Sequence, residues 1–203
     1  MKNKTDFPSF VFFGSDGFAV AVLDTLAKSE ITPSLIITPE NLKTILRSDL
    51  KEISRSDLGL VASYGKIIPP TIFNLPKYET LNIHPSLLPK YRGPTPIQSA
   101  ILNGDKETGV TLMLLDAELD HGPILQAISY KLPASPAGGQ ARNFIEARDD
   151  LAKLGAELFL KTAPLWVAGK IKTVPQDHPR ATYTKKIKKE DGLINFANDP
   201  TFN

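Results

Sequence analysis

Asn82 and His84 are the residues of this 203-residue chain whose types and spacing most directly suggest chemistry. They lie two positions apart in an alternating segment, so on an extended strand both side chains point to one face. An asparagine amide can stabilise an oxygen that gains negative charge, and an imidazole can donate a second hydrogen bond or transfer a proton. Asp120 could orient that imidazole or relay a proton through water. The three residue types suit attack by an amine on an acyl-type carbon.

Other kinds of chemistry find less support in the sequence. The histidines His84, His121 and His178 show no metal-binding spacing, and asparagine is a poor ligand for transition metals, so we expect no metal site. The chain has no cysteine, which excludes disulfides and thiolate chemistry. Ser86 lacks the glycine-flanked elbow of a serine nucleophile. The alternative that remains open is a buried strand whose Asn82 and His84 are only hydrogen-bonded in the core.

The elements that must position these residues alternate between strand and helix patterns. Short apolar runs typical of buried strands lie at residues 9–13, 33–38, 58–63 and 80–84. Helical spacing of apolar residues lies between the first three of them, at residues 18–27 and 41–50. This alternation predicts an α/β fold with an open, twisted, mostly parallel sheet and flanking helices. Gly14 and Gly17 do not complete a dinucleotide motif, so an ordinary turn is favoured there.

The second half of the chain continues with one capped helix, two strands and one long helix. Thr95 to Gln98 has the form of a capping box and predicts a helix to about Leu102. Residues 109–115 and 124–132 predict two antiparallel strands, because the loop between them is too short for a crossover. An apolar stripe from Gln140 onward predicts a long core helix that Pro164 would end or kink.

Composition places few further limits on function. Apolar residues make up 41% and charged residues 23% of the chain, as in soluble globular proteins, and the net charge is only +2. No run approaches the roughly 18 apolar residues of a membrane span, and the start has no signal-peptide layout. We therefore expect a cytoplasmic protein with no membrane partner. The lysines around residues 185–189 are interpreted as a solvated face that could contact a polyanion. The oligomeric state leaves no pattern in the sequence.

Four segments in fixed order resemble one enzyme family: residues 81–89, 92–98, 107–111 and 119–122. They resemble the formyltransferases that use 10-formyltetrahydrofolate, and most closely the methionyl-tRNA branch of that family. The resemblance covers most of residues 9–195 and implies a Rossmann-like formyltransferase domain. The catalytic asparagine, histidine and aspartate of the family fall on Asn82, His84 and Asp120. It therefore implies transfer of a formyl group to an amine.

The same resemblance implies where the folate donor and the acceptor bind. The expected folate-binding residues are Tyr64, Gly65, Lys66, Ile67, Ser86, Leu87, Leu88, Pro89 and Leu119. The pterin ring is expected to bond mainly to backbone groups, and no metal is implied. The expected acceptor is initiator methionyl-tRNA.

Two departures from the methionyl-tRNA branch keep other functions open. The loop after Ile37 is short where that branch has a basic loop, and the chain stops at Asn203 where that branch continues into a small β-barrel. We expect a catalytic domain over residues 1–180 and a linker or tail over 181–203 toward an absent C-terminal domain. The alternative acceptors are an amino-sugar nucleotide or glycinamide ribonucleotide. A non-catalytic folate- or RNA-binding module and, more distantly, a dinucleotide enzyme are the alternatives from other classes.

Overall fold

The computed structural model describes residues 7–132 and 144–192. The described residues form a six-stranded sheet in the order β2-β1-β3-β4-β5-β6. The strands are β1 (Phe10–Phe13), β2 (Leu35–Ile37), β3 (Leu58–Val61), β4 (Thr80–His84), β5 (Glu107–Leu114) and β6 (Ile124–Lys131). Strands β1 to β4 pair in parallel, whereas β5 is antiparallel to both β4 and β6. The predicted α/β fold with an open, mostly parallel sheet is confirmed.

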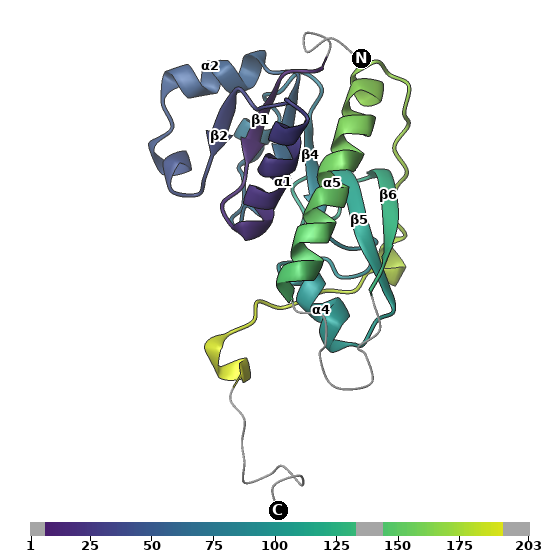
Figure 1. Ribbon diagram of the computed structural model, residues 1–203. Coiled ribbons are helices and arrows are strands. Elements are labelled where there is room, and N and C mark those ends of the chain that lie inside the picture. Colours follow the sequence, from purple (N-terminus) through teal and green to yellow (C-terminus); the bar gives the residue numbers. More distant parts are fainter. Residues whose placement is uncertain (1–6, 133–143, 193–203) are drawn as a thin grey trace, which may run out of the picture.

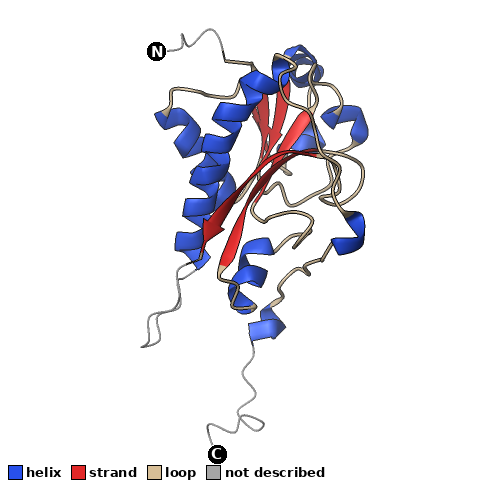
Figure 2. Ribbon diagram, turned by 90° about the vertical axis from the view of Figure 1, so that its right-hand side faces the viewer, coloured by secondary structure: helices blue, strands red, loops and turns tan. Residues whose placement is uncertain are grey.

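Helices lie on both faces of this sheet, as Figure 2 shows. The α-helices are α1 (Gly17–Lys28), α2 (Arg47–Arg55), α3 (Pro70–Phe73), α4 (Pro96–Leu102) and α5 (Phe144–Val167). Three short 3₁₀ helices are η2 (Asn41–Thr44), η3 (His178–Arg180) and η4 (Lys189–Gly192). Helices α1 and α5 pack against each other on one face (Figure 1). Within the described residues, no helix combines the length and apolar character that a bilayer span requires.

Two hydrophobic cores fill the two faces, and β4 contributes to them unequally. The larger core joins α1, α4 and α5 to the sheet, and it includes Leu81 and Ile83 of β4. The smaller core joins α2 and α3 to the first strands and contains no residue of β4. Because side chains alternate along a strand, Asn82 and His84 point to the face opposite Leu81 and Ile83. The alternation predicted for β4 therefore leaves two polar side chains on the face where the core is smaller.

The second strand is less buried than its sequence suggested. Residues 33–38 were predicted as a buried strand, but β2 covers only Leu35–Ile37 and lies at the edge of the sheet. Ile36 is 44% exposed, and only Ile37 of the three is fully buried. An apolar run cannot distinguish a central strand from an edge strand, because that distinction depends on the order of the strands.

The helix predicted at residues 41–50 is wrong as a single element. The chain forms η2, then an extended backbone at Ile45 and Leu46, and only then α2. The Asp49 side chain accepts a hydrogen bond from the Leu46 N–H at 2.8 Å, which fixes the start of α2 at Arg47. An acidic residue in the first turn also interacts favourably with the positive end of the helix.

One helix-cap prediction is wrong, and of the two effects predicted for Pro164 the structure excludes the first. Helix α4 begins at Pro96 as predicted, but its Thr95 makes no side-chain cap. The Thr95 hydroxyl instead donates to the Lys185 carbonyl at 2.8 Å, so a tertiary contact replaces the local one. Pro164 does not end α5, which continues to Val167. Proline removes one backbone N–H, and a helix that is about to end loses little from one missing bond. Gln140, where this helix was expected to begin, lies outside the described residues.

Gly155 is expected to set how closely α5 can approach the sheet. A Cβ at this position would clash with Cγ2 of Ile83 and would lie 3.3 Å from Cγ1 of Val110. Alanine favours a helix by about 1 kcal/mol over glycine, but overpacking a core costs about 1–3 kcal/mol. We therefore expect Gly155→Ala to lower the free energy of unfolding, measured with urea. Lys153→Ala, at an exposed position on the same helix, is the control, and a Gly155→Ala protein more stable than wild type would contradict this packing.

Candidate active site

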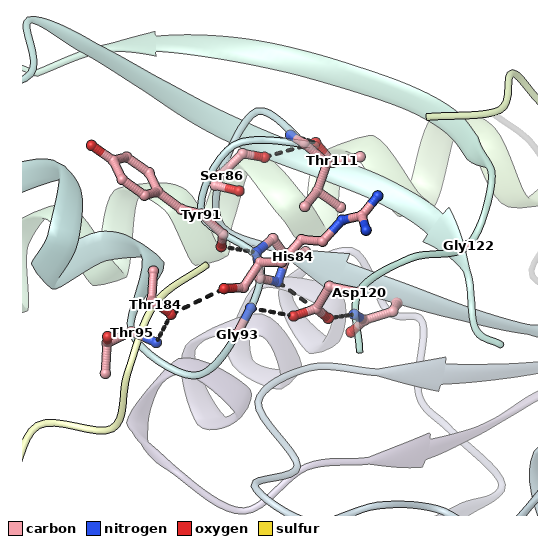
Figure 3. A network of polar contacts seen from close by, with 12 residues as sticks. His84, Ser86, Tyr91, Gly93, Thr95, Thr111, Asp120, Gly122 and Thr184 are labelled. Carbon is pink, nitrogen blue, oxygen red and sulfur yellow. Dashed lines mark hydrogen bonds and ion pairs between the residues drawn. The ribbon is translucent and has the colours of Figure 1, made fainter. Parts of the chain in front are cut away.

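The structure brings Asn82, His84 and Asp120 together. Asn82 and His84 are 7% and 5% exposed on β4, and Asp120 comes from the loop between β5 and β6. Nδ2 of Asn82 donates to Oδ1 of Asp120 at 3.3 Å, and Nδ1 of His84 lies 3.6 Å from the same oxygen. Oδ2 of Asp120 accepts the Gly93 backbone N–H at 2.7 Å (Figure 3). Three polar groups therefore converge on one carboxylate.

The hydrogen bonds of His84 define which ring nitrogen carries hydrogen. Nε2 lies 2.9 Å from the Tyr91 carbonyl oxygen, which can only accept, so Nε2 must donate. Nδ1 is then the ring nitrogen that faces Asp120. An imidazole held in this way presents a single defined position for proton transfer.

The Tyr91 backbone is held in an unusual conformation to make this contact. Its φ is +63°, a left-handed value that non-glycine residues rarely adopt. The Tyr91 hydroxyl donates to Asp105 at 2.7 Å and accepts from Asn103 at 2.7 Å. Burial of Asp105 acts to raise its pKa, but hydrogen bonds from Lys90 and Tyr91 outweigh this effect and leave the pKa below its ordinary value. A charged Asp105 therefore anchors the residue that orients His84.

Asn82 retains a donor for a substrate. Its amide has two N–H groups, and the recorded bond to Asp120 uses one of them. The second N–H can donate to an oxygen that becomes negatively charged during an acyl transfer. The arrangement thus offers an oxyanion donor, a carboxylate that can accept a proton, and an oriented imidazole.

The loop after β4 is braced by its own polar groups. Ser86 is fully buried, and its hydroxyl donates to the Lys90 carbonyl at 2.6 Å. The Thr111 hydroxyl donates to the Ser86 carbonyl at 2.7 Å and accepts from the Leu88 N–H at 3.1 Å. Leu88 is buried, whereas Leu87 and Pro89 are half-buried. Folate binding by residues 86–89 stays a prediction. Because the Ser86 hydroxyl already donates its proton to the Lys90 carbonyl, it has no further proton to donate to a ligand.

The predicted folate-binding segment after β3 divides into a buried and an exposed part. The Tyr64 ring is 2% exposed within the smaller core, whereas Gly65, Lys66 and Ile67 are exposed. Ile67 is 89% exposed, and the described structure records no backbone hydrogen bonds for residues 65–67. These residues can therefore offer free backbone groups beside an apolar side chain.

The loop that carries Asp120 starts beside this segment. Leu115 packs against the same core cluster as Tyr64 and Ile68, and Leu119 further along the loop is 60% exposed. Exposed apolar side chains next to free backbone groups fit a flat heterocycle such as a pterin. The roles of Tyr64, Gly65, Lys66, Ile67 and Leu119 stay predictions.

Tyr64 gives the fold a pH dependence at high pH. Burial, assisted by the negative charge of Glu40, raises the pKa of Tyr64 from 10.0 to about 12. Above pH 10 the unfolded chain loses this proton before the folded chain does, so the free energy of unfolding should fall as pH rises from 10 to 12. Tyr64→Phe should flatten this part of the pH profile in chemical denaturation, although it also loses the 3.2 Å bond to the Thr38 carbonyl. An unchanged slope would contradict the assignment to Tyr64.

The turn before α1 does not hold the features of a dinucleotide site. Asp16 caps α1 by accepting the N–H groups of Phe18 and Ala19 at 2.9 and 3.2 Å. Its other carboxylate oxygen accepts the Ser63 hydroxyl at 2.5 Å. A phosphate bound at this helix N-terminus would meet a carboxylate. The plain turn favoured for Gly14 to Gly17 agrees with this geometry.

Metal chemistry gains no support from the described residues. Among them, no group of three or more histidine, aspartate or glutamate side chains could hold a metal ion. His121 bonds to Asp116 at 2.7 Å, and its ring stacks on that of His178 with centroids 4.0 Å apart.

Two buried residues without a predicted role support the site: Arg92, and Gln176 from a distant part of the chain. Arg92 is 2% exposed, and both its backbone groups pair with the C-terminal segment: its N–H donates to Thr182 at 2.8 Å, and its carbonyl accepts from Thr184 at 2.7 Å. Gln176 is 5% exposed and donates to the Asp120 carbonyl from 56 residues away. Arg92 lies in a basic and aromatic cluster that begins one of the segments resembling the family, but no role was predicted for it, and no local pattern indicates Gln176.

The sequence matches one protein family over most of the part that forms the site. Residues 13–136, more than half of the chain, match the family described as Formyl transferase. The chain belongs to the formyltransferase family. The matched range of this formyltransferase chain contains Asn82, His84 and Asp120 together with both predicted folate segments.

Individual relatives agree with the family. A methionyl-tRNA formyltransferase from Chloroflexus aurantiacus is 43% identical over 162 residues, which cover 80% of this chain and 50% of that protein. The formyltransferase chain thus spans about half the length of that curated relative. HypX from Aquifex aeolicus, solved with tetrahydrofolic acid, has a TM-score of 0.74 at 20% identity, covering 97% of this chain and 33% of that one. A Clostridium thermocellum methionyl-tRNA formyltransferase has a TM-score of 0.66 at 19% identity, covering 93% and 76%. At these identities the two structures show a shared fold.

Proposed function

We propose that this chain transfers the formyl group of 10-formyltetrahydrofolate to the amino group of methionyl-tRNA. The observation that carries the proposal is the convergence of Asn82, His84 and the Gly93 N–H on the carboxylate of Asp120. The family match supports formyl transfer, and the name of the Chloroflexus relative supports methionyl-tRNA as the acceptor.

The residues have separate tasks in the proposed reaction. The donor supplies a formyl carbon that the acceptor amine attacks. The free N–H of Asn82 donates to the formyl oxygen as it gains negative charge. Asp120 accepts the proton that the amine loses, directly or through water, and Nδ1 of His84 interacts with Asp120 while that charge changes. The proton is returned to the folate nitrogen as its bond to the formyl carbon breaks.

The test supplies one donor and a panel of acceptors. With 10-formyltetrahydrofolate we expect formylation of charged initiator tRNA. The product is measured by mass spectrometry of the released formylmethionine. Transfer only to an amino-sugar nucleotide or to glycinamide ribonucleotide would overturn the assignment of methionyl-tRNA as the acceptor. Folate binding without transfer to any acceptor would overturn the enzyme assignment and select a binding module.

We infer that a cluster of four exposed lysines contacts the acceptor tRNA. Lys185, Lys186, Lys188 and Lys189 are exposed directly after the segment that pairs with Arg92. Replacing all four by glutamine should raise KM for tRNA about tenfold at low salt and reduce its salt dependence, because each phosphate contact contributes to the salt slope. The fourfold variant should keep the wild-type kcat. The control replaces Lys28 and Lys51, which are exposed elsewhere, and an unchanged salt slope in the fourfold variant would contradict this role.

A further inference from the structure

Arg92 is a buried cation whose recorded side-chain partners are neutral. It is among the largest fully buried side chains of the described structure. Nε and Nη2 donate to Oε1 of Gln176 at 3.1 and 2.6 Å, Nη2 also donates to Nδ1 of His178 at 2.9 Å, and Nη1 donates to the Tyr183 hydroxyl at 3.3 Å. A buried charge is tolerated only when its hydrogen bonds are satisfied. The guanidinium therefore fixes the Gln176 amide in one orientation.

Gln176 transmits this orientation to the loop that carries Asp120. With Oε1 held by Arg92, the amide nitrogen must point the opposite way, and it donates to the carbonyls of Asp120 and Gly122 at 2.9 and 2.8 Å. Both N–H groups and the oxygen of this amide are thus used. The carbonyls of Asp120 and Gly122 are therefore bonded to an amide whose orientation is set by Arg92.

The Asp120 backbone requires such support. Its φ is +47°, a left-handed value that costs a non-glycine residue about 1–2 kcal/mol. The Asp120 side chain is held by the Gly93 N–H, which donates to Oδ2, and the Asp120 backbone is held by Gln176, which donates to its carbonyl. Gly93 follows Arg92 directly, so one short segment and its arginine fix Asp120 from both ends.

We propose that Gln176, oriented by Arg92, is a positioning residue that sets the Asp120 carboxylate for proton transfer. This inference rests on the proposed formyl transfer and adds a residue from the C-terminal segment to it. Gln176 itself touches neither Asn82 nor His84 in the recorded contacts, so its effect passes through Asp120.

Gln176→Glu is the sharpest test. A glutamate keeps an acceptor for Arg92 but loses the two N–H donors to Asp120 and Gly122. We expect kcat to fall about 10- to 100-fold, as for small misplacements of a reacting group, with KM for the folate donor unchanged. Tyr183→Phe is the matched control, because it removes another Arg92 contact without altering the Gln176 amide, and it should keep kcat. An unchanged kcat in Gln176→Glu would overturn the proposal.

A double-mutant cycle tests the route through Asp120. In an Asp120→Asn background, Gln176→Glu should cause less than a twofold further loss, because the group that it positions is already removed. An equal loss in both backgrounds would show that Gln176 acts elsewhere and would overturn the positioning role.

A readout without catalysis separates this proposal from the proposed function. The Gly93 N–H donates to the Asp120 carboxylate, and the Arg92 N–H donates to the Thr182 carbonyl. In Gln176→Glu, hydrogen exchange measured by NMR should accelerate about tenfold at Gly93 and stay unchanged at Arg92. An unchanged Gly93 rate would overturn the proposal even if the wild type formylates. The expected rates in a wild type that formylates nothing would show that Gln176 positions Asp120 and that the proposed function is what failed.

A second variant covers a failure of Gln176→Glu to fold. Arg92→Met with Gln176→Met removes the buried charge and its partner together, which is often tolerated where removal of one partner is not. It too lacks the donors to Asp120 and Gly122, so the same loss of kcat is expected. A folded double variant with wild-type kcat would overturn the proposal.

Discussion

Asp120→Asn is expected to lower kcat about 10²- to 10⁴-fold, the range associated with loss of a general acid–base group. The asparagine cannot take a proton from the attacking amine. The wild-type carboxylate accepts hydrogen bonds from the Gly93 N–H and from Asn82. An asparagine amide can accept only one of these two bonds, because its N–H₂ group must face the other donor. The measurement is single-turnover formyl transfer at saturating donor, because it isolates the chemical step.

The control for this substitution changes a carboxylate elsewhere. Glu107→Gln removes the same charge at the exposed start of β5 and should leave kcat unchanged. A loss of less than about tenfold in Asp120→Asn would show that Asp120 only orients its neighbours and that proton transfer uses another group.

Asn82→Ala is expected to lower kcat about 10²- to 10³-fold, the usual effect of removing one oxyanion donor. The side chain lies on a buried strand and reaches Asp120, so the alanine loses both the free N–H and the contact that places it. KM for the folate donor should change little, because the interaction strengthens only as charge develops on the formyl oxygen.

Ile83→Val separates chemistry from stability on the same strand. It removes one methylene from the opposite face of β4, in the larger core, and should cost about 1 kcal/mol of unfolding free energy while kcat stays unchanged. An Asn82→Ala protein with a raised KM and normal kcat would contradict the oxyanion role and indicate ordinary substrate binding.

Much of the fold and part of the site could be predicted because their signals are local. Asn82 and His84 share a face since they lie two residues apart on one strand, and β4 ends at His84 just before Pro85. Proline disfavours continuation of a central strand, so the exit of the chain at this point was also readable. Asp120 could be named through the family resemblance, and its contact with both residues required the structure.

Other features depend on contacts that no local pattern encodes. Thr95 was expected to cap its own helix, yet its hydroxyl bonds to Lys185, which lies 90 residues later. The periodicity at residues 41–50 suggested one helix, but the extended backbone at Ile45 interrupts it. Arg92 had no predicted role of its own, and its burial involves the segment around Gln176 and Thr182, which bonds to its side chain and backbone.

The pairing of Arg92 with residues 182–184 also bears on how the protein is made. Chains fold from the N-terminal part first during synthesis, and every strand of the described sheet precedes residue 132. Asn82, His84 and Asp120 are therefore present in a nascent chain well before Gln176 and Thr182 exist to hold their loops. The network around Asp120 can therefore be completed only after residues 176–184 have been synthesised, whereas the strands and the residues that converge on Asp120 are made earlier.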